Sequence, residues 1–95
     1  MQKIHLIIYI TTLFALASCG TERAMKKAEQ HQAIGEYYDA AQQYRKAYQQ
    51  TPAKERTERG QRAVKMARCY AKINQTQRAI SAFRNAIRYQ QATLN

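Results

Sequence analysis

Two carboxylates, Glu36 and Asp39, stand three residues apart, a spacing that would place both on one face of a helix. A carboxylate pair of this kind is one arrangement that general acid–base chemistry uses. Both residues, however, fall where a helix is expected to begin, and acidic side chains there interact favourably with the positive end of the helix dipole. We therefore interpret them as helix-start residues rather than as a catalytic pair.

The other reactive side chains are sparse. His31 is the only histidine that follows residue 18, and a metal site would need several ligands in register. Cys69 lies between Arg68 and Tyr70, and we interpret it as a small buried hydrophobic residue. No glycine-rich phosphate loop occurs. The sequence therefore predicts no catalytic residue, no metal, no cofactor and no enzymatic activity.

The N-terminus has the pattern of a targeting segment. A positive start at Lys3 is followed by an apolar run over 4–17 and then by small residues. This run is shorter than the roughly 20 apolar residues that a membrane-spanning helix needs. We therefore expect residues 1–18 to be a cleaved signal peptide and residues 19–95 to be the mature domain.

The end of this segment, Leu16-Ala17-Ser18-Cys19, resembles the lipobox of bacterial lipoproteins. The resemblance implies that the Cys19 thiol receives a diacylglycerol and that cleavage makes Cys19 the lipidated first residue. Several acyl chains anchor a protein stably in a membrane. Residue 20 is Gly rather than Asp, which by the usual sorting rule implies the outer membrane, with the mature chain facing the periplasm. An ordinary signal peptide that is cut elsewhere is the alternative.

The mature chain contains an internal repeat. Ala40, Tyr44 and Ala47 recur as Ala79, Phe83 and Ala86, each pair 39 residues apart. Within each set the spacing of four and then three places the residues on one helical face. Gly35 and Asn74 tolerate the left-handed backbone that ends a helix. We expect an all-α domain of four helices in two antiparallel hairpins, with these bounds: 21–34, 36–50, 53–73 and 76–92.

This pattern resembles the tetratricopeptide repeat. The matching positions are Gly35, Tyr37, Ala40, Tyr44, Ala47 and Pro52 in the first unit and Met66, Ala67, Tyr70, Ala79, Phe83 and Ala86 in the second. The family's first-helix Trp is absent, since Ala24 and Ala63 stand there, and His31 occupies a position that is usually aromatic. The repeat length of 39 exceeds the family's 34, and we expect the extra residues to lengthen the start of the third helix. A plain pair of helical hairpins is the alternative.

The order of lipobox and repeats is also similar to the N-terminal region of certain OmpA-family lipoproteins of the Bacteroidota, which are associated with type IX secretion and gliding. In those proteins a β-propeller and a peptidoglycan-binding domain follow the repeats. The chain ends at Asn95 without them. The resemblance therefore implies a truncated piece of such a protein, and peptidoglycan binding is not carried over to these residues.

The charge is strongly basic: 16 Lys and Arg face 6 Asp and Glu, a net charge of +10. Residues 60–95 hold seven basic residues and no acidic one. A basic strip of this kind can follow a polyanion. Export argues against nucleic acid, so the anions within reach are lipid head groups, lipopolysaccharide and acidic proteins. A solvated helix surface without a ligand is the alternative.

Tetratricopeptide units line a groove with the first helix of each unit, and the resemblance implies which residues face it. These are Glu22, Met25, Glu29 and Gln32 in the first unit and Gln61, Val64, Arg68 and Ala71 in the second. The first set is acidic and the second is basic, which suits a polar peptide or helix as the partner.

The last helix presents Ile80, Phe83 and Ile87 with nothing after it to cover them. Truncation, a homodimer through this C-terminal helix, and docking on a partner are the three explanations.

We expect a non-enzymatic, membrane-anchored periplasmic scaffold that binds a protein subunit of an envelope or secretion assembly. The alternatives are a basic protein that binds anionic glycolipid or cell-wall polymer, and the N-terminal fragment of a larger OmpA-like peptidoglycan-binding lipoprotein.

Overall fold

The computed structural model describes residues 20–94, with side chains described as far as Tyr89. The predicted signal peptide (1–18), with its lipobox residues Leu16, Ala17 and Ser18, and the predicted lipid attachment residue Cys19 lie outside the described residues. The described part contains only helices and the turns that join them. This confirms the expectation of an all-α fold.

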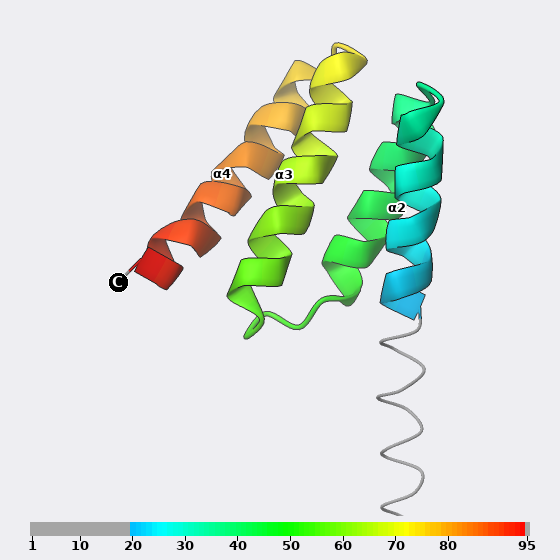
Figure 1. Ribbon diagram of the computed structural model, residues 1–95. Helices are drawn as coiled ribbons and strands as arrows, with labels where there is room; N and C mark the ends of the chain where they lie inside the picture. The colour runs from blue at the N-terminus through cyan, green and yellow to red at the C-terminus, as the bar shows by residue number, and fades with distance from the viewer. Residues whose placement is uncertain (1–19, 95) are drawn as a thin grey trace, which may run out of the picture.

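Residues 20–94 form four helices, which follow one another in an up-down-up-down order (Figure 1). The first is helical over 20–33, and it is followed by α2 (Tyr37–Gln50), α3 (Arg56–Lys72) and α4 (Thr76–Leu94). The first helix and α2 form one antiparallel hairpin, and α3 and α4 form the other (Figure 1). Because α3 packs against both α2 and α4, it joins the two hairpins into one body.

The same turn closes both hairpins. Gly35, at φ 81°, lets the amide of Glu36 donate to the carbonyl of His31 at 2.9 Å. Asn74, at φ 61°, lets the amide of Gln75 donate to the carbonyl of Tyr70, also at 2.9 Å. A left-handed residue followed by this bond is the Schellman ending of a helix. Each residue of the second turn lies 39 positions after its counterpart in the first turn. The repeat found in the sequence is therefore also a repeat of backbone geometry.

The linker between the hairpins differs from the prediction. We expected the third helix to begin at residue 53, but α3 begins at Arg56. The amide of Glu55 donates to the carbonyl of Pro52 at 3.0 Å, which makes residues 52–55 a tight turn, and the first α-helical bond runs from Arg59 to Glu55. Buried Thr51 holds this linker in place, since its Oγ1 donates to the carbonyl of Ala47 and accepts from the guanidinium of Arg62. Part of the extra repeat length is therefore linker rather than helix.

Alanines line the seams between the helices. The buried alanines are Ala24, Ala28, Ala40, Ala41, Ala47, Ala63, Ala67, Ala79, Ala82 and Ala86. Because alanine has the smallest side chain that favours a helix, these positions let neighbouring backbones approach closely. Tyr44, Met66 and Tyr70 fill the space that remains. The core is thus a stack of close helix contacts with a few large side chains at its centre.

The two aromatic positions of the repeat have different surroundings. Tyr44 is 1% exposed, whereas its counterpart Phe83 is 38% exposed. The reason is that α3 covers the Tyr44 face of α2, while no described element covers the corresponding face of α4. Ile80 and Ile87 are exposed on this face too, which confirms the prediction of an uncovered last helix.

No helix within residues 20–94 combines the length and the apolar content that crossing a bilayer requires.

Candidate interaction site

Three of the eight predicted groove residues line one hollow on the surface of α3. Gln32 comes from the end of the first helix, and Arg68 and Ala71 come from α3. This hollow, of about 340 Å³, is called the α3 hollow below. Its lining consists of Gln32, Tyr37, Arg68, Cys69, Ala71, Lys72 and Phe83. Because these residues come from all four helices, the hollow reaches from one hairpin to the other.

The other five predicted groove residues do not line this hollow. Glu22, Glu29 and Gln61 are exposed elsewhere on the first helix and α3. Met25 and Val64 are half-buried, and Met25 packs against the core. The structure therefore gathers the C-terminal ends of the two predicted rows and leaves the N-terminal ends apart from the hollow.

The α3 hollow combines apolar walls with two cations. Tyr37, Cys69 and Phe83 supply apolar surface, and Arg68 and Lys72 supply positive charge without any carboxylate in the lining. The Lys72 ammonium lies 6.0 Å from the centre of the Tyr37 ring, a cation–π distance. A hollow with this lining suits an apolar group that has a negative group beside it.

Burial alters the chemistry of two side chains at this site. Desolvation raises the pKa of the Cys69 thiol above its ordinary value, so the thiol stays protonated at neutral pH. Desolvation, with smaller effects from Cys69 and Glu29, also raises the pKa of Tyr44. The Tyr44 hydroxyl donates to Gln32 Oε1 at 2.7 Å, which holds one wall of the hollow in position. Because its thiol is buried and protonated, Cys69 is an unreactive packing residue here, in agreement with its interpretation from the sequence.

A second hollow, of about 400 Å³, lies between α2 and α4 over α3, and sequence reasoning missed it. It is lined by Arg45, Tyr48, Gln49, Met66, Tyr70, Gln77, Arg78, Ser81, Ala82 and Asn85. Arg78 donates to Gln75 Oε1 at 3.1 Å and lies 5.9 Å from the centre of the Tyr70 ring. Sequence reasoning missed this hollow because it placed the groove on the first helix of each hairpin alone. The signal that could have found it is the row of amides, hydroxyls and arginines on the second helix of each hairpin.

The basic residues of the described chain are not neutralised within it. In residues 20–94 the one ion pair joins His31 to Glu36, and no Lys or Arg pairs with a carboxylate. Arg59 instead packs against two rings, with its guanidinium carbon 4.5 Å from the centre of Tyr48 and 5.6 Å from that of Tyr89. The seven basic residues of 60–95 therefore leave their charge available to an external anion.

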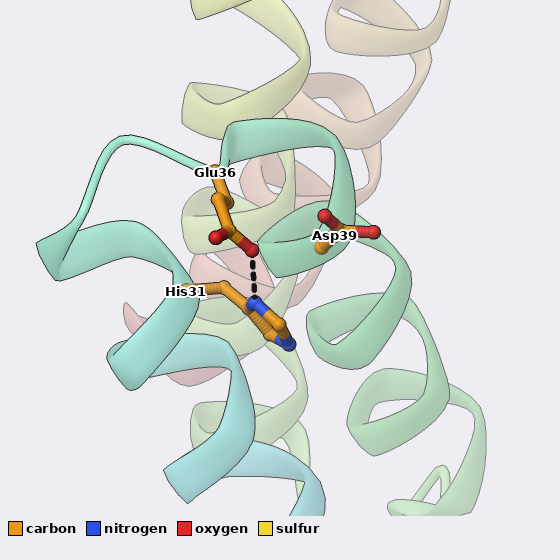
Figure 2. Close-up of side chains that lie close together, drawn as sticks. All are labelled: His31, Glu36 and Asp39. Carbon is orange, nitrogen blue, oxygen red and sulfur yellow. Dashed lines mark hydrogen bonds and ion pairs between the residues drawn. The ribbon is translucent and has the colours of Figure 1, made fainter.

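His31, which the sequence analysis treated apart from the Glu36 and Asp39 pair, meets both carboxylates at the turn between the first helix and α2 (Figure 2). His31 Nδ1 lies 2.8 Å from Glu36 Oε2, and one ligand atom of each of the three lies within 4.8 Å of the others. Three such groups could coordinate a divalent transition metal. The positive end of the α2 dipole opposes a cation at this place, and the His31–Glu36 contact already satisfies two of the three groups. The signal that could have joined them is Gly35, because a turn there brings residues 31 and 36 together.

Comparisons of the chain with protein-family models, with curated proteins and with solved structures found no match.

Proposed function

We propose that this chain is a lipid-anchored, non-enzymatic protein-interaction module of a bacterial envelope, built from two tetratricopeptide-like hairpins. The lipobox-like residues 16–19 support a membrane anchor on the periplasmic face of the outer membrane. The observation that carries the interaction role is the α3 hollow, which is lined by both hairpins and combines apolar walls with two cations. Its volume is large enough for the side chains of a docked segment rather than for a single water or ion.

The anchor is tested by replacing Cys19 with Ala in native cells. The unaltered chain is expected in the detergent phase of the membrane fraction, and C19A is expected to leave it because the acyl acceptor is gone. A matched C69A variant removes the other cysteine and should stay in the membrane fraction. Retention of C19A in the detergent phase would contradict the lipid anchor.

The interaction role is tested by photo-crosslinking in native cells. Ala71 is exposed and lines the α3 hollow, so a benzoylphenylalanine at this position would contact a docked partner. Lys46 is exposed on α2 and lines neither hollow, which makes it the matched control position. We expect a discrete crosslinked protein band from position 71 and none from position 46. The same pattern from both positions, or no band at all, would overturn the proposed module.

A basic envelope protein that binds anionic glycolipid or cell-wall polymer is the second candidate function. The observation that favours it is the unpaired basic surface of residues 60–95. This candidate expects the chain to bind vesicles that contain phosphatidylglycerol without acylation, and to release them as salt is added. Binding that survives in high salt, or that requires acylation, would exclude it.

A further inference from the structure

The α3 hollow and the uncovered face of α4 form one surface. Phe83 lines the hollow and also lies between Ile80 and Ile87 on α4, at helical spacings of three and four. The exposed fractions of Ile80, Phe83 and Ile87 are 39%, 38% and 52%. These three residues are called the α4 stripe below. They span two turns, a length of roughly 10 Å at the usual rise of a helix.

Cations lie beside this apolar surface. Arg68 and Lys72 stand at the hollow, while exposed Arg84 and Arg88 follow Phe83 and Ile87 directly on α4. None of the four pairs with a carboxylate in the described residues. A cation beside an apolar patch is stabilised by a partner that brings a carboxylate together with its apolar side chains.

Charge and shape together favour one occupant of this surface. A second copy of the chain would bring this patch against the same patch of its neighbour, because a two-fold interface is self-complementary. The patch holds Arg84 and Arg88, and α4 offers no carboxylate to meet them. Like charges brought together in this way cost free energy. A membrane surface also offers negative charge, but a planar surface matches the concave α3 hollow less well than a single docked side chain does. An acidic segment with a row of apolar side chains satisfies both the charge and the shape.

We propose that the α4 stripe and the α3 hollow together bind an acidic amphipathic helix of a partner protein. Its apolar residues, at spacings of three and four, pack along Ile80, Phe83 and Ile87, and one large apolar side chain enters the hollow. Its flanking carboxylates meet Arg84 and Arg88 along the stripe, and Arg68 and Lys72 at the hollow. This inference rests on the proposed interaction role and adds the chemistry of the partner.

The probe is a pair of synthetic 18-residue amphipathic helices with identical leucine rows, one with Glu and one with Lys on both flanks. Their binding to the full chain in phosphatidylcholine vesicles is measured by fluorescence anisotropy. We expect the Glu helix to bind at least tenfold more tightly than the Lys helix, and its affinity to fall as salt is added. Equal binding of the two helices would overturn the proposal.

Two variants and a matched control locate the site. We expect R84Q/R88Q, and separately F83S, to weaken binding of the Glu helix at least tenfold. The control R45Q/R56Q removes the same charge from residues outside the surface and should change the affinity less than threefold. Circular dichroism checks that each variant is folded, and because Phe83, Arg84 and Arg88 are exposed we expect all to be. Equal losses in the control and in R84Q/R88Q would show a diffuse charge effect and overturn the site.

Two further outcomes would also overturn the inference. One is binding of phosphatidylglycerol vesicles that R84Q/R88Q abolishes while the Glu helix does not bind, which would assign the surface to lipid. The other is a dimer in sedimentation that F83S dissociates, which would assign it to a second copy. A crosslink at Ala71 in cells without any binding of the Glu helix would leave the proposed function standing and contradict this inference alone.

Discussion

The hydroxyl of Tyr44, which is 1% exposed, donates a 2.7 Å hydrogen bond to Gln32 Oε1 at the rim of the α3 hollow. The core of the first hairpin is thereby tied directly to the surface that the proposed partner contacts. We expect Y44F to lower the free energy of unfolding by about 1 kcal/mol, the usual contribution of one such bond. Urea denaturation measures this difference. Y38F, which removes an exposed hydroxyl, is the control and should have almost no effect. Equal effects of the two variants would show that the Tyr44 bond is not formed.

The two equivalent aromatic positions should respond very differently to truncation. Y44A leaves a cavity among buried neighbours, and we expect it to cost about 3–5 kcal/mol or to unfold the chain. F83A removes a side chain that is already partly in water, and we expect a loss below about 1 kcal/mol. Thermal denaturation of both variants provides the comparison. A loss of several kcal/mol in F83A would mean that the Phe83 face of α4 is covered.

Stability should fall in alkaline solution. Burial raises the pKa of the Cys69 thiol and of the Tyr44 hydroxyl in the folded chain. At a pH between a group's unfolded and folded pKa values, the unfolded chain has therefore lost a proton that the folded chain still holds. In that interval the free energy of unfolding decreases as pH rises, whereas below it these groups leave stability unchanged. We expect the decrease to begin near pH 8.5, where an unfolded thiol ionises, and to continue above pH 10 with tyrosine. Urea midpoints between pH 7 and 11 measure it.

The cysteine part of this alkaline loss can be separated with C69A, which keeps the tyrosines. We expect C69A to have a flatter pH profile between about pH 8.5 and 10 than the unaltered chain. An identical slope in both proteins would show that the Cys69 thiol titrates equally in the folded and unfolded states.

The His31–Glu36 contact is expected to act as a link across the turn rather than as a metal site. Because both side chains are partly exposed, E36Q should lower the free energy of unfolding by no more than about 1 kcal/mol. Adding Zn²⁺ should leave the melting temperature unchanged, since the dipole of α2 opposes a cation there. A zinc-dependent rise in melting temperature that H31A abolishes would instead assign a metal site to His31, Glu36 and Asp39.

The sequence predicted the helices and their pairing because those features depend on local spacing. The order of Ala40, Tyr44 and Ala47 defines a helical face, and Gly35 and Asn74 define where helices end. The start of α3 was missed because Thr51 and Glu55 fix the linker through bonds that proline alone does not reveal. Helical periodicity does not report distances between helices, so neither the placement of Gln32 and Phe83 around one hollow nor the second hollow could be derived from it.

The repeated turns at Gly35 and Asn74 give the molecule an internal repeat symmetry with a period of 39 residues. Under this symmetry Tyr44 on α2 becomes Phe83 on α4, and the face that α3 covers becomes the face that carries the α4 stripe. The way α3 lies on α2 is therefore a geometric template for a helix lying on α4. A binding segment would reproduce the small and apolar residues of α3, but it would need carboxylates where α3 has Arg and Lys. Searching envelope proteins for such a charge-inverted copy of α3 is a direct way to turn this symmetry into a list of partners.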